Sequence, residues 1–292
     1  MGFGWIDFLL ISSAGGLIGF LAGMFGVGGG FLLVPILNIV LGIPMELAVG
    51  ASACQVLGPA TTSLLARKVR IRDLFFPLVM TGGLLLGVLA GTGVLEHAKA
   101  VAAISVNGKT IIVADLVVLI IYFLMLVSLG VISLRSARRT DAELRGALLK
   151  DRFQMPPLAR FPGLYDGKLS IPLIAWFGLG LGLISGLLGI SGGILLLPTL
   201  IFGLGIPTHR AISCSLVIVW IVAFQSTVAH AWHGNISLMI VIALLLGGTV
   251  GARLGSDLNA RLKGLQLRQQ FGWLLLAVAL MIGVRLVFLL AG

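Results

Sequence analysis

The chain has 292 residues, of which 59% are hydrophobic and only 10% are charged, and its mean hydropathy is +1.15. Soluble domains usually carry about 25% charged residues, so this composition excludes a soluble globular protein. The net charge of +10 does not indicate nucleic-acid binding, because the basic residues collect in the joints between apolar stretches, as membrane topology requires.

Apolar stretches follow one another along most of the chain, and the longer ones can cross a hydrocarbon core of roughly 30 Å as helices. The first has no basic leader and is expected to be a retained helix. Two stretches, 31–42 and 194–205, are too short to span. The sequence therefore predicts an all-α polytopic membrane protein with eight to ten segments. We expect these at 5–24, 31–42, 44–66, 74–95, 111–134, 171–188, 194–205, 208–231, 237–255 and 271–290.

The chain contains an internal repeat. An offset of 163 residues (186 − 23) aligns Gly23–Pro35 with Gly186–Pro198, and both segments pass from a glycine cluster through apolar residues to a proline. Duplication predicts a first membrane repeat at 1–134, a linker with some helix at 135–170 and a second repeat at 171–292. Each repeat holds five segments, counting the short one. An odd number reverses the chain direction, so the two repeats are expected to be inverted.

The distribution of Lys and Arg predicts the orientation, because cytoplasmic joints retain positive charge. Of the 20 basic residues, all but Lys99, Lys109 and Arg285 fall in or beside joints that can share one side of the membrane. We therefore expect the 135–170 linker in the cytoplasm and both termini in the periplasm.

Two glycine clusters interrupt the apolar pattern at corresponding positions of the two repeats. Backbone without regular hydrogen bonds is tolerated in the bilayer only against protein or water, so each cluster predicts a break between two helices. Paired breaks point to a transporter's binding site, where free amides suit an anion. The alternative is that the glycines only allow close helix packing, which is the expected role of Gly87, Gly91, Gly251 and Gly255. The predicted binding residues are Gly26, Gly28, Gly29, Gly30, Gly189, Ser191, Gly192 and Gly193.

The segments after each break carry polar side chains, which can bind an oxyanion without burying a full positive charge. Alternatively, Ser and Thr bond carbonyls of their own helix. Arg253 lies in an apolar segment, where it could neutralise an anion or extend to the interface. The further predicted binding residues are Ser52, Gln55, Thr62, Ser63, Ser215, Gln225, Ser226 and Arg253.

Other classes of chemistry have little support. The acidic residues lie near segment ends, which argues against a cation substrate. Cys54 and Cys214 are expected to be core residues. A turn at Gly189–Gly192 with Ser191 fits a serine nucleophile, but its repeat partner has Gly28, so an intramembrane hydrolase is a weak alternative. No catalytic residue, metal or cofactor is expected. The expected partners are a small anion and the lipid bilayer, a homo-oligomer is left open, and nucleic acid is not expected.

The sequence resembles the TauE/SafE family of bacterial membrane permeases through Gly23–Pro35, Gly186–Pro198, the polar segments after them, and the turns at Val69–Asp73 and Gly234–Ser237. The resemblance covers nearly the whole chain. It implies export of sulfite or a small organosulfonate such as sulfoacetate across the bacterial inner membrane, with the glycine breaks at the site. Because the family spans several substrates, another small anion or carboxylate is the alternative.

Overall fold

The computed structural model describes residues 5–37, 41–67, 74–101, 103–106, 109–137, 155–161, 168–188 and 193–291. Helices dominate these residues, and the predicted all-α class is confirmed. The helices are α1 (Trp5–Phe25), α2 (Gly30–Pro35), α3 (Met45–Ala66), α4 (Phe75–Val101), α5 (Val113–Ser136), α7 (Ile171–Leu188), α8 (Gly193–Pro198), the π-helix η4 (Thr199–Gly203), α9 (Thr208–Trp232), α10 (Leu238–Arg261) and α11 (Gly264–Ala291).

Among the described residues, four helices are long and apolar enough to cross a membrane: α1, α9, α10 and α11 as far as Val284. Shorter apolar helical stretches lie at Phe75–Gly91, Phe123–Ser136, Ile171–Ile184 and Gly193–Gly203. Large apolar side chains are exposed on the bundle, including Leu17, Leu86, Leu246, Trp273 and Leu280. An exterior of this kind suits lipid rather than water.

Several helices are longer than the apolar pattern predicts. α11 begins at Gly264 instead of 271, α10 continues to Arg261 instead of 255, and α4 continues to Val101 instead of 95. The added turns are rich in polar residues. Helix formation needs only internal backbone hydrogen bonds, whereas the hydropathy pattern reports the apolar part of each helix.

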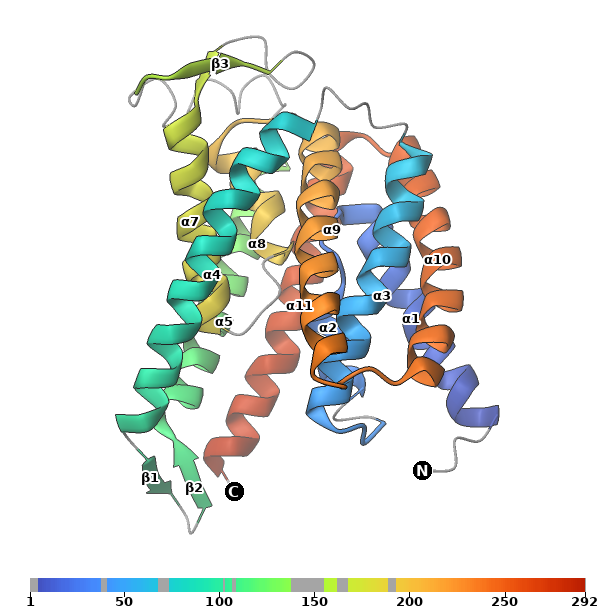
Figure 1. Cartoon of the computed structure of the whole chain (residues 1–292), viewed down its shortest axis with the longest axis vertical. Coiled ribbons are helices and arrows are strands. Elements are labelled where there is room, and N and C mark those ends of the chain that lie inside the picture. Colours follow the sequence, from blue (N-terminus) through green and yellow to red (C-terminus); the bar gives the residue numbers. More distant parts are fainter. Residues whose placement is uncertain are drawn as a thin grey trace.

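Two short hairpins lie outside the helical bundle, and the apolar pattern does not predict either. β1 (Ala103–Val106) pairs antiparallel with β2 (Lys109–Ile112), and β3 (Leu158–Arg160) with β4 (Lys168–Ser170). The second hairpin falls in the predicted linker, and the helix expected in that linker lies outside the described residues. In Figure 1, α1 begins and α11 ends at the end of the bundle that carries β1 and β2, with β3 at the opposite end.

Close helix pairs interlock the two halves of the chain. α1 packs along α10, and α4 packs along α7. A Cβ added at Gly19 would overlap the Gly248 backbone, and one added at Gly182 would overlap the Leu84 backbone. The predicted packing role is confirmed for Gly87, Gly251 and Gly255, where a Cβ would likewise meet backbone of the facing helix. Under the proposed duplication, the first helix of each repeat therefore packs against the fourth helix of the other.

Candidate functional site

The first glycine cluster forms the predicted break. α1 ends at Phe25, and α2 begins at Gly30. Gly26, Gly28 and Gly29 have φ of 69°, 81° and 72°, the left-handed region that glycine adopts without steric cost. The second glycine cluster lies between α7, described as far as Leu188, and α8, described from Gly193, so the second break stays a prediction. Gly189, Ser191 and Gly192 lie between them, outside the described residues.

Side chains from three other helices hold the carbonyl groups at the end of α1. Arg67, just after α3, donates from Nη2 to the Gly23 carbonyl at 3.0 Å. Asn259 on α10 donates from Nδ2 to the Met24 carbonyl at 2.7 Å. Ser215 on α9 donates from its hydroxyl to the Gly26 carbonyl. A helix end in an apolar interior needs such partners, so these contacts fix the tip of the break in place.

The backbone N–H groups of the same tip, unlike these carbonyl groups, have no hydrogen-bond partner among the described residues. Within the residues that the structure describes, no group accepts a hydrogen bond from the N–H of Val27, Gly28 or Gly29. All three residues are buried. Successive amides in turn conformations form a concave site for anions. The tip therefore offers neutral hydrogen-bond donors in the protein interior, while the carbonyls of Gly23, Met24 and Gly26 already accept hydrogen bonds.

The start of α8 contacts the tip of the first break. A Cβ added at Gly193, the first residue of α8, would overlap the Val27 carbonyl oxygen. A Cβ at Gly28 would overlap the Val219 side chain on α9. Only glycine allows this approach at either position. The structure thus gathers Gly26, Gly28, Gly193 and Ser215 from both repeats at one place.

The polar helix α3 supplies further buried donors. Gln55 is 0% exposed, and neither its amide nitrogen nor its amide oxygen has a hydrogen-bond partner. It lies where α3 meets α10, since a Cβ at Gly248 would come within 2.8 Å of its Nε2 atom. Gly248 in turn packs on Gly19, about two turns of α1 before the break. Ser63 is also fully buried with an unpartnered hydroxyl. Such groups cost about 1–3 kcal/mol each if nothing ever binds them.

The other predicted residues have different environments. Ser52 is buried on α3, and Thr62 donates to the Gly58 carbonyl of its own helix at 2.9 Å, the alternative that the sequence offers. Gln225 is exposed on α9, and Ser226 beside it is half-buried. Arg253 is exposed and pairs with Asp257 at 3.5 Å on the same helix. The structure therefore does not bring Gln225 or Arg253 to the break.

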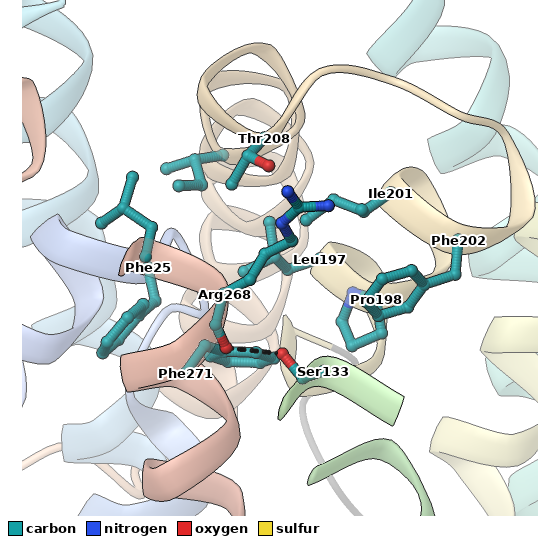
Figure 2. A pocket seen from close by; sticks show the side chains of 11 residues that line it. Phe25, Ser133, Leu197, Pro198, Ile201, Phe202, Thr208, Arg268 and Phe271 are labelled. Atoms are coloured by element: carbon teal, nitrogen blue, oxygen red, sulfur yellow. Dashed lines mark hydrogen bonds between the residues drawn. The ribbon is translucent and has the colours of Figure 1, made fainter. Parts of the chain in front are cut away.

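Two arginines are more buried than their place in basic joints indicates. Arg67 reaches the end of α1, and Arg268 on α11 is only 1% exposed. Sequence reasoning counts both as topology signals. In the structure, Arg268 lies beside the buried residues Leu267 and Phe271, on the inward face of α11 (Figure 2). The sequence signal that could have indicated this burial is the pair of apolar residues at 267 and 271.

Comparisons with known proteins agree over nearly the whole chain. The family model described as "Sulfite exporter TauE/SafE" matches residues 11–282. A "Probable membrane transporter protein" from Xylella fastidiosa (strain 9a5c) is 28% identical over 276 residues, which cover 91% of each chain. The "Probable membrane transporter protein YunE" from Bacillus subtilis (strain 168) is 22% identical over 265 residues, covering 88% of this chain and 90% of that protein. No solved structure matches.

Proposed function

Because the chain belongs to the sulfite exporter TauE/SafE family of membrane transporters, we propose that it exports a small sulfur-containing anion, either sulfite or an organosulfonate such as sulfoacetate, by alternating access. The observation that carries the proposal is the buried tip of the first break, which Gly193 at the start of α8 contacts. The three amides of this tip meet no acceptor among the described residues. Oxyanions of this size accept several hydrogen bonds at once. The tip and the Gln55 amide supply such donors without a buried charge in the membrane.

The interlocked helix pairs suggest which parts move. If each repeat moved as a contiguous unit, α1 would have to leave α10 and α4 would have to leave α7. Glycines place both pairs in backbone contact, so such separation would expose large packed surfaces. We propose that α1 with α10 and α4 with α7 are the rigid bodies, and that the breaks between them alternately face the two sides.

The proposed location is the bacterial inner membrane, with the basic joints in the cytoplasm and both termini in the periplasm. Figure 1 supports a common side for the two termini, since α1 begins and α11 ends at one end of the bundle. A cell that is negative inside favours anion export by about 2.3 kcal/mol per charge per 100 mV. A different small anion or a carboxylate is the alternative cargo. The names of the family and of its relatives describe transporters, which disfavours the hydrolase.

A Gln55→Leu variant tests the proposal in liposomes loaded with labelled sulfite or sulfoacetate. Leucine removes an amide that has no protein partner, so the melting temperature should stay the same or rise. If the amide binds the anion, flux should fall about tenfold or more, the loss expected for one hydrogen bond to a charged ligand. Gln270→Leu makes the same change at an exposed position of α11 and is the control.

Three outcomes separate the possibilities. Anion flux that falls in Gln55→Leu but not in Gln270→Leu, with both proteins folded, supports the site. Equal flux in all three proteins contradicts the role of Gln55. Failure of the wild-type protein to move any of these anions under an imposed voltage would overturn the proposed cargo, and a carboxylate series in the same liposomes would then test the alternative.

A further inference from the structure

Three polar groups without a partner lie along one face of α3. Gln55 and Ser63 are fully buried, and among the described residues neither the Gln55 amide nor the Ser63 hydroxyl has a hydrogen-bond partner. Arg67, which directly follows the helix, has a buried Nε atom in the same condition. Residues four and eight positions apart share one helix face, so these three groups form a line about 18 Å long, which we call the α3 stripe.

The α3 stripe faces the α1–α10 pair at positions occupied by glycine. A Cβ added at Gly248 of α10 would come within 2.8 Å of the Gln55 Nε2 atom and 3.1 Å of the Pro59 Cγ atom, and Pro59 lies on the same face of α3. At the other end of the stripe, Arg67 bonds the Gly23 carbonyl of α1 at 3.0 Å. Glycine has no side chain, so the facing helices offer no polar side chain to the stripe at these two positions.

Arg67 is a positive charge without a negative partner. Its hydrogen bond to the neutral Gly23 carbonyl is the only interaction that its side chain makes with the described residues, whereas Arg253 pairs with Asp257. Burial lowers the pKa of the Arg67 guanidinium to about 10, so the group still carries its charge at neutral pH. Arginine binds oxyanions through parallel N–H groups. The unused Nε–H group of Arg67 is therefore suited to an anion.

The α3 stripe reaches the height of the glycine break. Gly28 at the tip lies against Val219 of α9, and the next residue, Trp220, donates from Nε1 to the Thr61 hydroxyl of α3 at 2.9 Å. Thr61 lies two positions before Ser63, so Ser63 and the tip are at nearly the same height in the bundle. In Figure 1, α3 ends toward the end of the bundle that carries β3. The stripe thus runs from that end, past the height of the tip, into the interior.

We propose that the α3 stripe is the half of the anion path that joins the basic end of the protein to the glycine break, and that Arg67 selects negative charge at its mouth. This inference rests on the proposed function and adds a charged residue to it. In this conformation the α1–α10 pair covers the stripe. When that pair moves away as a rigid body, Arg67 and Ser63 lie one helical turn apart, close enough for one sulfonate group to accept hydrogen bonds from both.

Anion binding to the purified full-length protein in detergent tests the α3 stripe without requiring transport. The probes are sulfite and sulfoacetate, with chloride for comparison, and the readout is the rise in melting temperature with anion concentration. The KM of flux in liposomes is measured beside it. Arg67→Gln should weaken binding and raise KM about tenfold or more, the loss expected for a hydrogen bond to a charged group. Arg67→Lys keeps the charge and should recover a large part of the affinity. Arg261→Gln, at an exposed position at the end of α10, should match wild type.

Ser63→Ala tests the stripe without the stabilising bond that Arg67 makes to α1. It removes a buried hydroxyl that has no partner among the described residues, so the melting temperature without anion should stay the same or rise. Anion binding should nevertheless weaken about tenfold, because the hydroxyl would donate to a charged ligand. The matched control is Ser13→Ala, since Ser13 is exposed on α1 and bonds the Leu10 carbonyl of its own helix at 2.8 Å.

A purely structural stripe gives a different result. If Arg67 only caps α1 and water alone occupies the stripe, Arg67→Gln will melt at a lower temperature, but both variants will keep the anion-dependent rise and the KM of wild type. That result overturns the inference and leaves the proposed transport intact. Binding that depends on Arg67 and Ser63 in a protein that moves none of the anions supports the site and overturns the proposed transport.

Discussion

Replacing Gly26 by alanine is expected to damage the break far more than its single added carbon suggests. Gly26 has φ of 69°, and an added Cβ would lie 2.7 Å from the Ile212 carbonyl oxygen. An alanine in the left-handed region costs about 1–2 kcal/mol. Moving the Cβ and the carbonyl to an acceptable distance of 3.0 Å needs a shift of at least 0.3 Å (3.0 − 2.7), in a tightly packed interior where overpacking costs about 1–3 kcal/mol.

Gly234→Ala separates these two effects. Gly234 has φ of 71° in the turn after α9, and a Cβ there would meet nothing within 4 Å. The control variant therefore carries the same backbone strain without the overlap. We expect Gly26→Ala to lose about 2–5 kcal/mol of folding stability and Gly234→Ala about 1–2 kcal/mol. Because the Gly26 carbonyl also accepts the Ser215 hydrogen bond, the shift should misplace the amides of Val27 and Gly28.

The assay is labelled sulfite and sulfoacetate flux into liposomes at equal amounts of folded protein, with denaturant unfolding in detergent beside it. Flux should fall at least tenfold in Gly26→Ala and stay within about twofold of wild type in Gly234→Ala, because displaced amides no longer match the geometry that a preorganised site requires. Equal flux in the two variants, with Gly26→Ala the less stable, would refute the reasoning, because the tip would then be a packing feature only.

Two further predictions concern the scaffold of the site. Ser215→Ala removes the hydroxyl that donates to the Gly26 carbonyl and leaves that carbonyl buried without its donor. We therefore expect the unfolding free energy to fall by about 1–3 kcal/mol and the flux to be reduced. Unchanged stability would mean that this hydrogen bond does not hold the tip. Gly19→Ala places a Cβ into the Gly248 backbone and should separate α1 from α10. Its melting temperature should drop, whereas Gly82→Ala, with nothing within 4 Å of the added carbon, should match wild type or exceed it.

The sequence predicts the helical breaks because their causes are local. Glycine adopts many backbone conformations, so a run of glycines disfavours a regular helix, and the duplicated pattern predicts that the interruption occurs twice. The same local logic gives the membrane class and the approximate helix positions. It misses the hairpins β1–β2 and β3–β4 and the polar helix ends, since these depend on backbone pairing beyond the apolar stretches.

Residue burial shows where sequence reasoning reached its limit. Gln55 and Gln225 are both amides on polar helices, yet the first is fully buried and the second is exposed. Sequence analysis counts both Arg253 and Arg268 among the basic residues that predict the orientation. Arg253 lies on the surface and pairs with Asp257, whereas Arg268 is buried. Which face of a helix turns inward depends on its neighbours, and the main neighbours of α10 and α11 are α1, α3 and α5, from the other predicted repeat.

The sequence by itself determined that this protein lies in a membrane, because hydropathy is read directly along the chain. Its glycine content and charge distribution predict that the apolar helices are interrupted twice and that the two repeats are inverted. Only the tertiary structure decided that α1 pairs with α10 and α4 with α7, that Gly193 touches Val27, and that Arg268 is buried beside the first break. These contacts join residues about ninety or more positions apart, and they depend on close packing of whole helices, which no local pattern specifies.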